Sequence, residues 1–105
     1  MEEHKTELSS KKVLLLEERG TTSRFIQARI EDNGNLVVEG QDVGAAPLKW
    51  FDDEDYEFIV TVRKEDKDLV LLALIQKLFG GKFRAVDDFR EFLEEKGVPF
   101  GWTTW

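Results

Sequence analysis

The hydrophobic pattern of this chain changes its period at about residue 64, and that change limits the folds it can adopt. Residues 55–63 alternate apolar and polar side chains except at Ile59, which is the period of two of a half-buried β-strand. Residues 69–79 are apolar on most sides and end at Gly80-Gly81, as a covered helix does. The sequence therefore predicts strands followed by helices, the order of an α+β protein.

An Asn-Gly pair between two alternating segments predicts a β-hairpin within residues 24–40. A two-residue turn would place Ile30 opposite Val37 and would set a carboxylate on the apolar face. A three-residue loop with a left-handed Gly34 instead places Ile30 opposite Leu36 and keeps that face apolar. We therefore expect the bulged three-residue loop.

The other elements follow from shorter patterns. Residues 12–18 combine helix-forming side chains with a short length before a turn, so strand and helix both stay open, and we favour a strand. Residues 85–96 have helical spacing and precede Gly97, which suits a left-handed C-cap. Residues 100–105 are rich in strand formers, which predicts a further strand.

The expected fold is α+β, with one antiparallel sheet of four or five strands and two helices packed on one face, in the order ββββαα(β). Residues 1–10 are polar and aperiodic and are expected to form a flexible tail. Residues 11–105 then form a single domain. Four apolar side chains at helical spacing should be almost wholly buried at the centre of its core: Leu71, Leu74, Ile75 and Leu78.

Composition excludes several kinds of active site. The 105 residues contain no cysteine and one histidine, His4 in the expected tail, so thiolate nucleophiles, cysteine–zinc sites and histidine bases are not available in the domain. We expect no enzyme activity, no cofactor and no metal site. The longest apolar run, residues 69–75, is too short to cross a membrane, and residues 1–7 do not resemble a signal peptide. These observations lead us to expect a cytoplasmic protein.

The net charge of −7 favours a basic protein as partner, and without a cluster of lysine and arginine no nucleic acid is expected. The densest acidic stretch, residues 52–57, holds five carboxylates and follows two aromatic residues. It is either a solvated loop or a docking surface, and the tryptophans either close the edge of the core or anchor a partner. The candidate partner-binding residues are Trp50, Phe51, Asp52, Asp53, Asp55, Trp102 and Trp105.

Residues 40–44, Gly-Gln-Asp-Val-Gly, indicate a turn that ends a strand, with Asp42 capping its own backbone. Two glycines can also cradle a phosphate, but this segment has no basic residue and no helix after it. We therefore expect a turn.

Several of these segments together resemble a group of small bacterial proteins of unknown function. The likeness rests on residues 40–44, on Tyr56 to Val62, on Phe79-Gly80-Gly81 and on Phe92-Leu93 with Gly97-Val98-Pro99-Phe100. It implies a bacterial, stand-alone domain and assigns no functional residue. Small acidic α+β proteins of bacteria also include toxin-neutralising immunity proteins, which are an analogy of size and charge.

The sequence favours a non-enzymatic module that binds a basic protein through an acidic and aromatic surface, with an immunity-like inhibitor as its sharpest form. Two alternatives stay open. One is a domain that binds a small molecule or a divalent cation through residues 40–57. The other is a structural homodimer.

Overall fold

The computed structural model describes residues 11–44 and 55–104. The chain divides into a sheet unit that ends at Lys67 and a helical unit that begins at Asp68. Four strands and one short 3-10 turn form the sheet unit: β1 (Lys12–Glu18), β2 (Thr22–Ile30), β3 (Leu36–Gly44), β4 (Asp55–Val62) and η1 (Lys64–Asp66). Two helices follow: α3 (Lys67–Phe79) and α4 (Ala85–Lys96).

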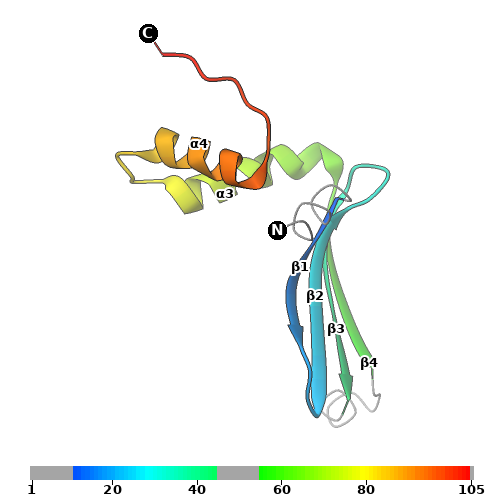
Figure 1. The fold of residues 1–105 in the computed structure, drawn as a ribbon. Helices are drawn as coiled ribbons and strands as arrows, with labels where there is room; N and C mark the ends of the chain where they lie inside the picture. The colour runs from blue at the N-terminus through cyan, green and yellow to red at the C-terminus, as the bar shows by residue number, and fades with distance from the viewer. Residues whose placement is uncertain (1–10, 45–54, 105) are drawn as a thin grey trace. The chain divides into compact units, whose positions relative to one another are not determined.

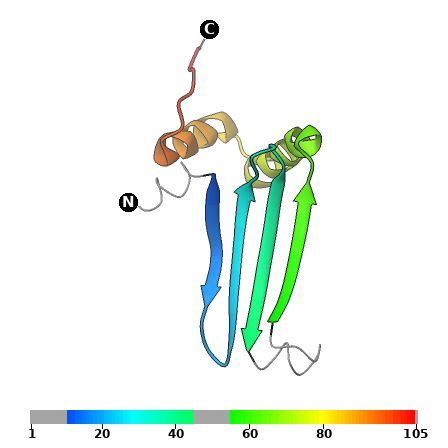
Figure 2. The same cartoon turned by 90° about the vertical axis from the view of Figure 1, so that its right-hand side faces the viewer.

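The strands form one antiparallel sheet in the order β1-β2-β3-β4, as Figures 1 and 2 show. The α+β class and the order ββββαα are therefore confirmed, and so is a strand rather than a helix at residues 12–18. Residues 98–104 form no strand, so the sheet has four described strands and not five.

The loop between β2 and β3 has the predicted three residues. Ile30 lies opposite Leu36, and Gly34 has a φ of 97°, in the left-handed region. The backbone N–H of Glu31 donates to the carbonyl of Asn35 at 2.8 Å, and that of Gly34 donates to the carbonyl of Glu31 at 2.8 Å. The bulged loop is thus confirmed, and it sets the register of the whole hairpin.

The register gives the sheet two different faces. Residues directly opposite each other on antiparallel strands share a face, so the pairing assigns each paired residue to one face. We call the first the apolar face: Val13, Leu16, Ile26, Ala28, Ile30, Leu36, Val38, Phe58, Val60 and Val62. We call the second the polar face: Lys12, Leu14, Glu17, Phe25, Gln27, Arg29, Val37, Glu39, Gln41, Glu57, Ile59 and Thr61.

Residues 40–44 do not form the predicted turn, because β3 continues through them to Gly44. The pairing with β2 and β4 runs through Gly40 without a shift. Glycine is needed at residue 40 because the aromatic ring of Phe58 occupies the space next to its backbone. A Cβ at this residue would lie 2.4 Å from Cε2 of Phe58. A glycine inside a strand often marks such a close approach. Asp42 therefore sits within the strand and does not cap a turn.

The helical unit is a pair of helices joined at one end by aromatic contacts. The ring of Phe79 meets the ring of Phe89 edge-on, with centroids 5.7 Å apart, and also lies 6.3 Å from that of Phe92. α4 ends at Gly97, whose φ of 73° is left-handed. The backbone N–H of Val98 donates to the carbonyl of Leu93 at 2.9 Å, which completes the predicted C-cap.

Within the helical unit Leu71, Leu74 and Leu78 are exposed, so α4 alone does not bury this stripe as expected. The aromatic contacts to α4 involve Phe79, at the last residue of α3, and one neighbouring helix can cover only one side of so apolar a helix. Two expectations are left untested and stay predictions: that residues 11–105 form one domain, and that both helices pack on one face of the sheet.

Gly34→Ala should lower the free energy of unfolding by about 1 kcal/mol, because a β-carbon is strained at left-handed φ. The added carbon would also lie 3.3 Å from Cβ of Lys64. Urea unfolding followed by circular dichroism would measure the loss. Gly20→Ala is the matched control, since Gly20 has no positive φ and the nearest atom to its added carbon is 3.9 Å away. Equal stability of the two variants would contradict the left-handed loop.

Candidate functional site

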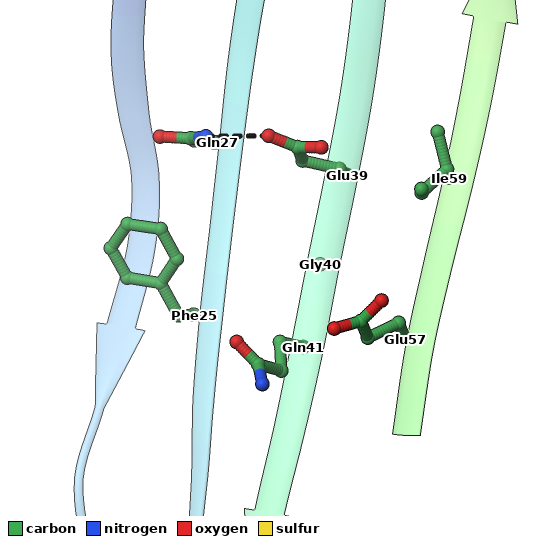
Figure 3. A pocket seen from close by; sticks show the side chains of 7 residues that line it. All are labelled: Phe25, Gln27, Glu39, Gly40, Gln41, Glu57 and Ile59. Atoms are coloured by element: carbon green, nitrogen blue, oxygen red, sulfur yellow. Dashed lines mark hydrogen bonds between the residues drawn. The ribbon is translucent and has the colours of Figure 1, made fainter. Parts of the chain in front are cut away.

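A hollow of about 210 Å³ opens on the polar face of the sheet. It lies over two neighbouring rows of cross-strand neighbours: Gln27, Glu39 and Ile59 form one row, and Phe25, Gln41 and Glu57 form the next. In Figure 3 Phe25 and Ile59 stand on opposite sides of the hollow, with Gly40 between them. Its full lining is Phe25, Gln27, Glu39, Gly40, Gln41, Glu57 and Ile59.

Gly40 lies in the backbone beneath the hollow and allows close packing on the opposite side of the sheet. Because its neighbours in β3 point to the polar face, Gly40 belongs to the opposite side, where the Phe58 ring covers its backbone. The ring takes the place of the missing side chain, so the strands stay in register beneath the hollow. The polar face above Gly40 is then built by Glu39 and Gln41, the residues on either side of it.

A hydrogen-bonded carboxylate closes one end of the hollow. The Arg29 guanidinium donates from Nε to Oε2 of Glu39 at 2.9 Å, and the Gln27 amide donates to the same oxygen at 2.5 Å. These donors stabilise the charged form and lower the pKa of Glu39, with the hydrogen bond from Arg29 as the larger cause. Arg29 also lies within 3.5 Å of Glu31. Glu39 is therefore an anchored acceptor rather than a proton donor near neutral pH.

A second ion pair lies on the same side of the sheet as the apolar face. Arg24 donates to Asp42 through both Nε and Nη2, at 2.7 Å and 2.6 Å, in the two-pronged geometry that guanidinium and carboxylate favour. The hydrogen bond from Arg24 lowers the pKa of Asp42, which is buried. The Arg24 guanidinium also lies 5.7 Å from the centre of the Phe58 ring. This pair ties β2 to β3 and to the ring that covers Gly40.

The hollow is bordered by apolar side chains that water reaches. Phe25 on the inner strand β2 is 41% exposed, and Ile59 on the edge strand β4 is 58% exposed. The carboxylate of Glu57 has no hydrogen-bond or ion-pair partner among the described residues. The site thus combines exposed apolar surface, one hydrogen-bonded carboxylate and one exposed carboxylate without a protein partner among the described residues, within a shallow depression.

Such an arrangement can make hydrogen bonds and apolar contacts. In the part of the chain that the structure describes, no three acidic or histidine side chains come together to hold a metal ion. Within the same residues, neither helix is long and apolar enough to cross a membrane.

The predicted partner-binding residues fall mostly outside the described residues. Trp50, Phe51, Asp52, Asp53 and Trp105 all lie there, and Asp55 is described only as the first residue of β4. Trp102 is described: its ring lies 4.1 Å from the Arg90 guanidinium in the helical unit, and it is partly exposed. Trp102 thus belongs to the helical unit, whereas the hollow is formed by residues of the sheet unit alone.

Sequence reasoning missed the hollow, although its signal is present. The hairpin register predicted from Asn33-Gly34 already places Phe25, Gln27 and Glu39 on one face. What the pattern could not show is that β3 continues past Gly40, because a pair of glycines more often marks a turn.

Comparison with protein-family models found no match to this chain, and neither did comparison with curated proteins or with solved structures.

Gly40→Ala should lower the free energy of unfolding by about 1–3 kcal/mol, because the added carbon would overlap the Phe58 ring. Phe58→Leu in the same chain should recover part of that loss by giving the carbon room. A double-mutant cycle from urea unfolding measures the coupling. If the two losses simply add, Phe58 is not what requires a glycine at residue 40.

The lowered pKa of Glu39 predicts a pH-dependent contribution to stability. A carboxyl whose folded pKa lies below its ordinary value of 4.5 stabilises the fold above that pH and loses the contribution as pH falls through the folded pKa. Glu39→Gln should therefore unfold more easily than the wild type near neutral pH, with a deficit that shrinks as the pH falls below 4.5. The deficit should be smaller in an Arg29→Gln background. A deficit that does not change with pH would contradict this account.

Proposed function

We propose that this chain is a non-enzymatic protein-interaction module whose polar face binds a partner protein. The observation that carries the proposal is the exposure of Phe25 and Ile59 around a hollow that is otherwise polar. A polar sheet face in contact with water alone gains nothing from exposing a phenylalanine and an isoleucine. Protein interfaces bury apolar anchors of this kind beside polar groups that are already hydrogen-bonded, and here Phe25 and Ile59 border a hollow in which Gln27 and Glu39 are hydrogen-bonded to each other.

The hydrogen-bonded groups of the face support binding rather than turnover. Glu39 is held by two donors, so its geometry is fixed before a partner arrives. Preorganised groups reduce the entropy lost on association. The same hydrogen bonds occupy the carboxylate, which favours a role in positioning over one in proton transfer.

A basic protein is the partner class that the charge favours. The net charge of −7 attracts a positive surface over long range and speeds association. An immunity-like inhibitor of a basic toxin, in the cytoplasm of a bacterium, is the sharpest form of the proposal. The hollow is smaller than the roughly 300–1,000 Å³ of most small-molecule pockets, which favours a protein over a small molecule here.

Phe25→Ser should abolish capture of the partner. The wild-type chain, Phe25→Ser and Leu72→Ser would each be immobilised and exposed to a bacterial lysate, and captured proteins would be identified by mass spectrometry. Leu72 is the matched control, because it is a 66% exposed apolar residue on α3. A basic protein should be retained by the wild type and by Leu72→Ser and should be released as salt rises.

Two results would contradict the proposal. In one, Phe25→Ser captures the same basic protein as the wild type. In the other, Leu72→Ser loses that protein while Phe25→Ser keeps it, which would move the interface to the helical unit.

A further inference from the structure

The two edges of the sheet differ in how they are protected against pairing. β1 carries a register shift between Leu14 and Leu16 and has Lys12 at its start. A bulge and charged side chains are the usual means by which an edge strand resists a further strand. β4 has no such shift, since its pairing with β3 runs evenly from Leu36↔Val62 to Val43↔Asp55. Its charged residues, Asp55 and Glu57, lie at one end, and residues 58–62 carry no charge.

The β4 edge is also apolar and exposed. Ile59 is 58% and Val60 is 63% exposed, on opposite faces of the strand. Among the described strands only β3 pairs with β4, so alternate N–H and carbonyl groups of β4 face away from the sheet. A straight, β-branched edge of this kind is a template for another strand.

The sequence of β4 is complementary to itself when two copies run antiparallel with Val60 on the two-fold axis. Phe58 then lies opposite Val62, and both belong to the apolar face. Ile59 lies opposite Thr61 on the polar face. β-branched and aromatic cross-strand pairs of this kind stabilise antiparallel sheets.

The charged residues at the two ends of this strand favour the same register, with Val60 on the axis. With Val60 on the axis, Glu57 lies opposite Arg63, and the two-fold symmetry forms this ion pair twice. Arg63 continues β4 in an extended conformation, with φ −64° and ψ 151°. Its bonds to Asp66, both 3.3 Å long and exposed, are weak enough to be exchanged. Moving the axis to Ile59 would set Glu57 opposite Thr61 instead.

We infer that two copies of this chain pair through β4, antiparallel and with Val60 on the axis, to form one continuous eight-stranded sheet. The inference goes beyond the partner proposed for the polar face and does not depend on it. It supplies the Glu57 carboxylate, which has no partner among the described residues, with a cation from the second copy.

Single cysteines test the register, because the chain contains none of its own. Val60→Cys should form a disulfide-linked dimer under mild oxidation, since the two sulfurs meet at the axis. The control is Val62→Cys on the same face: its two copies would lie about 13 Å apart along the strands, beyond the reach of a disulfide. Equal cross-linking of the two variants would overturn the register.

A charge exchange tests the ion pairs without cysteine. Glu57→Arg and Arg63→Glu each place like charges opposite one another twice, so each should raise the dimer Kd about tenfold or more in sedimentation equilibrium. The double variant should return the Kd toward the wild-type value. A dimer that neither single variant weakens, or a wild-type chain that stays monomeric up to about 1 mM, would overturn the inference.

Phe25→Ser separates this inference from the proposed function. It should still form the dimer, because Phe25 lies on β2, away from the β4 edge. Loss of the polar-face partner with the dimer intact would leave this inference standing.

Discussion

The left-handed loop at Gly34 decides which side chains of the sheet share a face. A slip of one residue in an antiparallel pair moves every side chain to the other side. With Ile30 opposite Leu36, the ladder from β2 through β3 to β4 collects the aliphatic side chains on one face. The same register puts Arg29 and Glu39 together on the other face, where they form an ion pair. The hollow therefore depends on a loop at the far end of the hairpin.

Gly40 and Phe58 show how one side of a sheet shapes the other. The ring needs a glycine beneath it, and the glycine lets β3 pass straight between its two neighbours. A bulkier residue would push the ring away or bend the strand, and the rows of Glu39 and Gln41 would shift with it. Arg24 reinforces the arrangement, because it contacts both Asp42 and the Phe58 ring.

Local signals predicted much of this fold, and long-range contacts account for what they missed. Asn33-Gly34 and Gly97 act within a few residues, so their loop and cap could be read from the sequence and are confirmed. The need for glycine at residue 40 could not be predicted this way, since it comes from the ring of Phe58, a residue on the neighbouring strand. The hollow was missed for a related cause. Acidic and tryptophan-rich segments can be recognised from composition alone. Phe25 and Glu39 line one hollow only because β2, β3 and β4 are paired in this register.

Pairing through β4 would change what the polar face can do. Because a two-fold axis through Val60 continues each face of one sheet into the same face of the other, two hollows would share one surface. Ile59 would stand near the axis and Phe25 farther from it on each side, since β2 lies two strands from the edge. A partner that is itself two-fold symmetric could then engage both hollows at once. Its second contact would form at a high effective concentration, so weak binding at each hollow would suffice for a stable complex.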